Sequence, residues 1–123
     1  MRIVFAVWFL AHGVAHLPGF LVSWQLRDFS GLPFHTTVLG DSVDLGTVGA
    51  RLIGVGWLLA AVAFAVLAAA TILRVEWWHQ AAYVVLGFSL MLCVLGWPRA
   101  WIGLISNIVV AVVLLTATRF GWA

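Results

Sequence analysis

Two histidines with helical spacing are the residues of this chain best suited to chemistry. His12 and His16 stand four residues apart in the apolar stretch FLAHGVAHLPGF, which covers residues 9–20. Residues four apart lie on one face of a helix, so both imidazoles would point the same way. This is the geometry of HxxxH metal pairs, in which each ring supplies one nitrogen ligand. The same two rings could instead relay protons, line a polar pocket or join neighbouring helices.

A metal site would need at least one further protein ligand. The zinc-protease motif places a glutamate after its first histidine, and Gly13 stands there in this chain. Side chains that could fold down from the polar segment after the first apolar stretch are His35, Asp41 and Asp44. One interpretation of the pair is therefore a divalent metal site formed by His12, His16 and Asp41.

Other cofactors and reactions have less support. Bis-histidine haem needs a second histidine at matching depth on a facing helix, and His79 is expected at the opposite membrane face, so haem is disfavoured. The chain contains no GxSxG sequence, no phosphate-binding glycine loop and no CxxC pair. These patterns identify no catalytic residue and leave open whether the protein is an enzyme.

The composition places these polar residues in a membrane protein. Of the 123 residues, 65% are hydrophobic and 8% are charged, whereas soluble domains carry about 25% charged residues. A chain of this size cannot bury so much apolar surface inside itself, so the lipid bilayer is its expected environment. Its six basic residues are arginines spread along the chain, which make no basic patch for nucleic acid.

Four apolar stretches are long enough, or nearly so, to cross the bilayer as helices. A span needs about 20 residues, and these stretches do not alternate as barrel strands would. Tight links between the later stretches make neighbouring helices antiparallel. We therefore predict an all-α, four-helix transmembrane bundle that forms a single domain over residues 1–123. Its spans are expected at about residues 3–24, 46–73, 78–97 and 101–118, with a long loop at 25–45.

The arginines near the ends of the spans favour one orientation by a narrow margin. Arg2, Arg74 and Arg119 fall on the side of both termini, and Arg27 and Arg99 fall on the side of the long loop, where Arg51 could also be counted, so the margin is three against two or three. Because positive residues concentrate in the cytoplasm, we expect both termini to be cytoplasmic and the loop to lie outside.

Polar residues from all four spans are expected in the half of the membrane nearer the long loop. His12 falls at the membrane centre. At about 1.5 Å per residue, one polar residue of each span falls at a similar depth nearer the loop: His16, Arg51, Ser89 and Asn107. The other half is almost purely aliphatic. Because polar groups inside a membrane usually face the protein interior, we predict a pocket open toward the loop, with Asp44 above it on the helix face of Arg51.

Each of these residues also has a purely structural interpretation. Arg51 could extend its head to the membrane surface, and Asp44 could cap the second helix. Ser89 and Asn107 could join helices by hydrogen bonds. A pocket is nevertheless predicted, because the polar groups gather in one leaflet.

Four stretches of the sequence together carry a resemblance to a known family. They are HGVAHLPGF in the first span, GARLIGVGWLLAAVAF in the second, WW before the third and WPRAWIGLISN leading into the fourth. In layout and hydropathy they resemble small bacterial membrane proteins of the DoxX-like type. The resemblance implies the bacterial cytoplasmic membrane and a link to quinone-dependent redox systems. The single cysteine, Cys93, does not match the redox cysteines of that family, so no catalytic residue is transferred.

Two functions of different classes follow from these observations, and a third, a channel or transporter, is disfavoured because the half of the spans near the termini offers no polar path unless an oligomer makes one. The first is a membrane protein whose loop-side pocket binds a lipophilic small molecule or a metal, with a quinone or a divalent cation as candidate cofactor. The second is an accessory or structural subunit of a larger membrane complex, in which small residues and tryptophans serve only packing and anchoring. The expected partners are the lipid bilayer and either further copies of this chain or other membrane subunits.

Overall fold

The computed structural model describes residues 1–123 and contains four long helices. All four are long and apolar enough to cross a membrane. The predicted fold class, an all-α four-helix bundle of an integral membrane protein, is therefore confirmed. The helices are α1 (Arg2–Ser23), α2 (Gly46–Ile72), α3 (Trp78–Leu95) and α4 (Trp101–Arg119).

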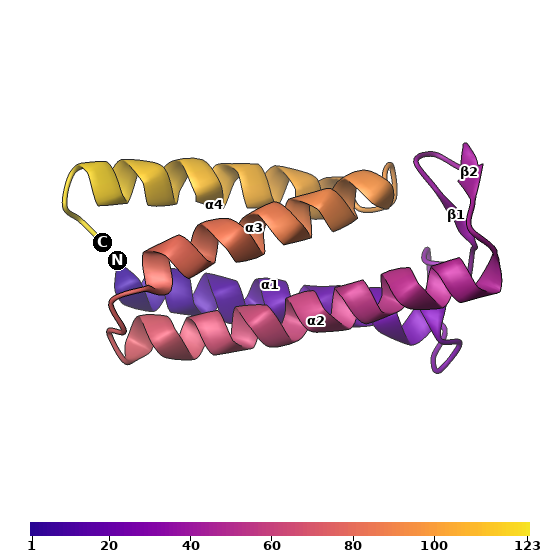
Figure 1. Ribbon diagram of the computed structural model, residues 1–123, viewed down its shortest axis with the longest axis horizontal. Coiled ribbons are helices and arrows are strands. Elements are labelled where there is room, and N and C mark those ends of the chain that lie inside the picture. Colours follow the sequence, from indigo (N-terminus) through magenta and orange to yellow (C-terminus); the bar gives the residue numbers. More distant parts are fainter.

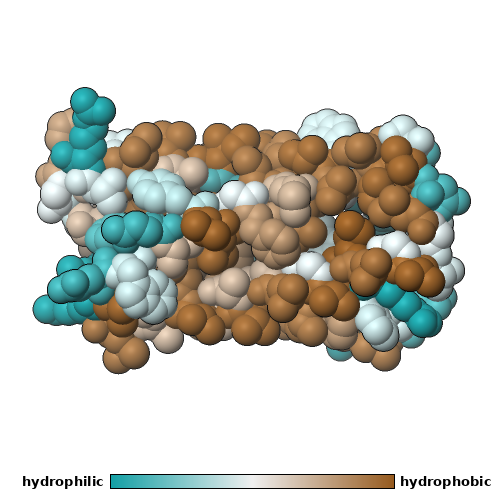
Figure 2. Space-filling view, in the orientation of Figure 1, coloured by the Kyte–Doolittle hydropathy of each residue, from teal (hydrophilic) through white to brown (hydrophobic).

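The four helices run lengthwise and neighbouring helices are antiparallel (Figure 1). Both termini lie at one end of the molecule, together with the link between α2 and α3. The segment 24–45 and the link between α3 and α4 lie at the other end. We call the part near the termini the terminus half, and the part near segment 24–45 the loop half. The face shown in Figure 2 is mostly apolar over its middle, with hydrophilic residues gathered toward the two ends.

Glycines allow α1 and α2 to approach closely. A Cβ at Gly13 would lie 3.0 Å from the carbonyl oxygen of Ala61 and 3.0 Å from Phe64 Cβ. A Cβ at Gly54 would lie 2.6 Å from Ser23 Cβ, which is closer than real Cβ contacts come. Lipid-embedded helices associate largely through such close backbone packing, because lipid provides no hydrophobic drive between them.

The terminus half contains a dense apolar core. Its centre is a group of aromatic rings: the Phe9 ring stacks near Phe64 with centroids 6.1 Å apart and lies 6.4 Å from the Trp78 ring. Leu67 and Leu114 complete it, with 1% and 0% of their surface exposed. The one polar side chain fully buried in this half, Thr71, donates its hydroxyl to the carbonyl of Leu67 in its own helix.

A small β-hairpin interrupts the long loop. Its strands are β1 (Thr37–Val38) and β2 (Val43–Asp44), paired antiparallel. The amide of Leu39 donates to the carbonyl of Leu95, and the amide of Gly40 donates to the carbonyl of Trp97, each at 2.8 Å. The turn of the hairpin is thus attached to the end of α3 and to the link that follows it.

Candidate functional site

Four polar residues from three helices meet in the loop half. His12 and His16 project from α1, Ser89 from α3 and Asn107 from α4. None has more than 7% of its surface exposed. Ser89 is the hub: its oxygen lies 2.8 Å from His16 Nε2, 2.9 Å from Asn107 Nδ2 and 3.4 Å from His12 Nε2. The helical spacing of the histidines therefore brings both rings to one hydroxyl.

The positions of the protons in this network follow from its partners. The backbone carbonyl of His12 can only accept, so His16 Nδ1 carries a proton and donates to it at 2.8 Å. No carboxylate faces the pair to balance a positive charge, so each ring is neutral and His16 Nε2 accepts from the Ser89 hydroxyl. The Ser89 oxygen then accepts from His12 Nε2. His12 Nδ1 is left as an acceptor, 3.5 Å from the Ser106 hydroxyl.

Asn107 joins the network through its side-chain nitrogen only. Its Nδ2 donates to Ser89 and also lies 3.6 Å from Cys93 Sγ. Its Oδ1 is buried without a hydrogen-bond partner. Buried acceptors of this kind are uncommon in native proteins, because each one forfeits its hydration without compensation. The network thus retains unused hydrogen-bonding capacity.

Aromatic rings hold the two imidazoles in place. The Trp8 ring stacks on His12 at 4.4 Å between centroids, and the Phe64 ring meets His12 edge-on at 5.0 Å. The Trp57 ring lies 5.2 Å from His16. Gly19 makes room for this indole, since a Cβ there would come within 2.7 Å of Trp57 Cγ. The histidines are therefore fixed in direction by packing as well as by hydrogen bonds.

A cavity of about 320 Å³ lies in the loop half, between this network and the hairpin. His12, His16 and Ser106 line its polar floor, and its walls include Val22, Ile53 and Trp57. The volume falls at the lower end of the range of about 300–1,000 Å³ typical of small-molecule sites, and mostly apolar walls with a few polar groups are their usual lining.

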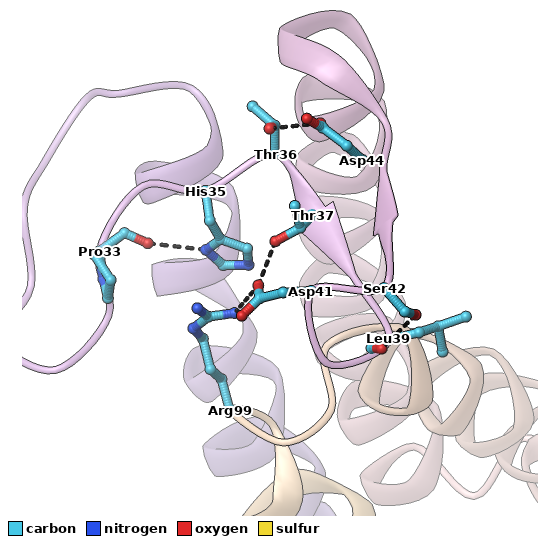
Figure 3. Close-up of polar contacts among 9 residues, drawn as sticks. All are labelled: Pro33, His35, Thr36, Thr37, Leu39, Asp41, Ser42, Asp44 and Arg99. Carbon is cyan, nitrogen blue, oxygen red and sulfur yellow. Dashed lines mark hydrogen bonds and ion pairs between the residues drawn. The ribbon is translucent and has the colours of Figure 1, made fainter.

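The hairpin and the link before α4 form the rim of the cavity. His35, Thr37 and Arg99 line it there. Figure 3 shows the Arg99 guanidinium directed at the Asp41 carboxylate, which also accepts a hydrogen bond from Thr37. The Arg99–Asp41 pair is 3.4 Å apart. The imidazole of His35 points toward the same group and donates from Nδ1 to the carbonyl of Pro33 at 2.9 Å.

Three residues predicted for the site lie outside the polar network. Arg51 is exposed, with its guanidinium over the Trp24 ring at 5.3 Å. Asp44 is exposed and accepts from the Thr36 hydroxyl at 2.7 Å and from the Gly46 amide at 2.9 Å, and these bonds lower the pKa of its carboxyl. Asp41 is held in the hairpin, where the Thr37 bond and then the charge of Arg99 lower its pKa. None of the three is among the cavity-lining residues.

The donor set around the histidines does not form a metal site with three protein ligands. The chain has no group of three or more His, Cys, Asp or Glu side chains placed to hold an ion. Asp41, predicted as the third ligand, is instead paired with Arg99. The Nε2 atoms of both rings lie close to Ser89 Oγ, at 2.8 and 3.4 Å, so this hydroxyl occupies the position that an ion shared by the two rings would take.

A serine–histidine arrangement is also present but is closed to substrates. Ser89 and His16 are within hydrogen-bonding distance, and a backbone carbonyl orients the imidazole, which is the layout of an activated nucleophile. However, Ser89 has no exposed surface and does not line the cavity. Its hydroxyl therefore organises the network rather than attacking a bound molecule.

Comparisons with known proteins give no relative. No family model, curated protein or solved structure matches this chain. The resemblance to DoxX-like proteins stays a prediction drawn from layout.

Some cavity residues were not predicted from the sequence. Ser106 completes the floor, but a lone serine beside Asn107 carries no distinctive pattern. Trp57 is a wall of the cavity, and its position deep inside a span, away from the membrane surface preferred by tryptophan, was a signal for it. Arg99 reaches the rim only because the hairpin folds over the link before α4.

Proposed function

We propose that this chain is an integral protein of the bacterial cytoplasmic membrane whose loop-half cavity binds a small lipophilic molecule. The proposed orientation has both termini in the cytoplasm and the hairpin outside. The observation that carries the proposal is the cavity itself, which combines apolar walls with a polar floor at the depth of the spans. Soluble metabolites would have to leave water to reach this site, whereas lipophilic ones already reside in the membrane.

The contrast with the terminus half supports this assignment. Helices that only anchor or pack would be expected to fill their interior along its whole length, since close packing is what holds membrane helices together. Here the terminus half is filled by aromatic and aliphatic side chains, while the loop half keeps about 320 Å³ free beside two imidazoles. Quinones are one class of lipophilic molecule that such a site could receive, and a redox role would follow from a ligand of that kind.

Photolabelling in lipid nanodiscs tests the proposal. The probe is a long-chain alkyl diazirine, used against the wild-type chain and two variants of α4. Ser106→Leu fills the cavity floor. Thr116→Leu makes a similar change at an exposed position in the terminus half, where the hydroxyl bonds only to the carbonyl of Val112.

Labelling that saturates with probe concentration is expected in peptides containing Ile53 and Trp57. Ser106→Leu should reduce this saturable labelling by about tenfold, and Thr116→Leu should leave it unchanged. Labelling that rises linearly with probe concentration, as for bulk lipid contact, or that is equal in all three proteins would refute the proposal.

A further inference from the structure

The atoms that the cavity floor offers to a ligand are specific. His16 has no free ring nitrogen, because Nδ1 and Nε2 are each engaged at 2.8 Å. His12 Nδ1 is held only by a long contact of 3.5 Å to Ser106 Oγ. The floor therefore presents one acceptor, His12 Nδ1, next to one group that can donate and accept, the Ser106 hydroxyl.

From this pattern we infer that the cavity takes a neutral amphiphile with a hydroxyl head, bound between His12 and Ser106, whose chain leaves the cavity between α1 and α4. The inference rests on the proposed function and specifies its ligand class. A hydroxyl can donate to His12 Nδ1 and accept from Ser106 at the same time. Both floor groups would then have a short partner in place of one long contact.

Other head groups fit this floor less well. A carboxylate has no proton to donate to His12 Nδ1, and its negative charge would be repelled by the lone pair of that nitrogen. A carbonyl or ether can accept from Ser106 but leaves His12 Nδ1 unpaired, which costs the desolvation of a buried acceptor. Among quinones, the hydroxyl-bearing reduced form therefore fits this floor and the oxidised carbonyl form fits it less well. A plain hydrocarbon leaves both groups unpaired. The only charged residue lining the cavity, Arg99, is at the rim and already pairs with Asp41, so it provides no free cation for an anionic head.

The packing of the helices leaves a path for the chain of such a ligand. The closely packed pairs are α1 with α2, α2 with α3 and α3 with α4, whereas α1 packs closely with neither α4 nor α3. Ala15 of α1 and Ile102 of α4 both line the cavity, and both side chains are exposed. Because the side chain of Ala15 is small, it adds little bulk between the two helices. A lipid could thus enter sideways from the membrane with its head directed at the floor.

A matched set of four diazirine probes of equal chain length tests the head-group preference in nanodiscs. The heads are a primary alcohol, its methyl ether, the corresponding carboxylic acid and a terminal methyl group. For the wild-type chain we expect labelling to saturate with every probe that binds the cavity. The half-saturating concentration should be about five- to tenfold lower for the alcohol than for the ether or the hydrocarbon, because one additional hydrogen bond strengthens binding by about that factor. The acid, tested at a pH at which its head is an ionised carboxylate, should label no better than the hydrocarbon.

Two pairs of variants assign the preference to the inferred atoms. Ser106→Ala should reduce the alcohol's advantage over the hydrocarbon to about twofold or less, and the control Thr116→Ala should retain it. Ala15→Leu narrows the gap between α1 and α4 and should weaken alcohol labelling several-fold. Ala11→Leu adds the same bulk at an exposed α1 position outside the cavity and should have no effect.

The outcomes separate this inference from the proposed function. Saturable labelling that is equal for all four heads, or strongest for the acid, would overturn the hydroxyl assignment and leave the lipophilic cavity standing. An alcohol preference that persists in Ser106→Ala would place the head elsewhere. An absence of saturable labelling with every probe would overturn the proposed function as well.

Discussion

The two halves of this bundle are built from the same four helices but are packed in different ways. In the terminus half, aromatic and aliphatic side chains such as Phe9, Phe64 and Leu114 fill the interior. In the loop half, hydrogen bonds between three helices hold the interior, and a cavity of about 320 Å³ remains. The difference shows how a small membrane protein can keep a void: directional bonds around Ser89 set helix separation there, while close packing in the other half maintains the fold.

Deleting side-chain volume should therefore have unequal effects in the two halves. Leu114→Ala removes a fully buried side chain from the dense core and should lower the free energy of unfolding by about 3 kcal/mol. Ile53→Ala removes a similar volume from a cavity wall and should cost about 1 kcal/mol, because the space beside Ile53 is already empty. Reversible unfolding in mixed micelles measures both. Equal losses would contradict the difference in packing.

Removing a buried hydroxyl should also lower the free energy of unfolding more in the loop half than in the terminus half. These losses should be somewhat smaller than the loss in Leu114→Ala. Ser89→Ala leaves His16 Nε2 and Asn107 Nδ2 without their partner and should cost about 2–3 kcal/mol. Thr71→Ala removes an equally buried hydroxyl that bonds only to a carbonyl of its own helix, and should cost about 1 kcal/mol or less. The same unfolding assay applies. A Thr71 variant as damaged as the Ser89 variant would show that Ser89 is no hub.

The smallest effect is expected at the hairpin, whose attachment to the rest of the protein should depend on pH. The pKa of Asp41 is lower in the folded protein than in the unfolded chain, so its contribution to stability is present above its ordinary pKa and is lost as pH falls through the lowered value. Acid should weaken attachment of the hairpin to the link before α4. The amides of Leu39 and Gly40 should lose exchange protection, while the helices keep theirs.

Asp41→Asn supplies the matched control for this titration. The variant should show reduced protection of the two hairpin amides at neutral pH, with little further loss on acidification. Protection that falls with pH equally in both proteins would mean that another group controls the attachment of the hairpin.

The helices were predictable because hydropathy depends on composition along the chain. Long apolar runs with arginine, tryptophan and proline near their ends indicated four spans. The hairpin could not be predicted, since its strands are only two residues each and are held partly by carbonyls of Leu95 and Trp97, far away in the sequence. Such long-range backbone bonds have no side-chain pattern.

The sequence predicts how deep in the membrane the residues of the candidate site lie, but not which face of the helix each one occupies. Counting residues from the ends of the spans placed His16, Ser89 and Asn107 at one level, and the structure brings them together. Arg51 was placed at the same level, yet it faces outward over the Trp24 ring. Helix rotation is about 100° per residue, so depth alone does not decide which face a side chain occupies. The π face of Trp24 provides a better environment for this cation than an apolar wall.

The central claim, that the loop half holds a lipophilic molecule and the terminus half does not, is tested most directly by nuclear Overhauser effects in deuterated micelles. The chain would carry protonated isoleucine methyl groups, and unlabelled dodecanol would be the ligand. We predict effects from dodecanol chain protons to the δ-methyl of Ile53 in the cavity wall that saturate with dodecanol, and only weak, non-saturating effects at the exposed Ile72. Equal behaviour of the two methyl groups, or no effect at Ile53, would contradict the account.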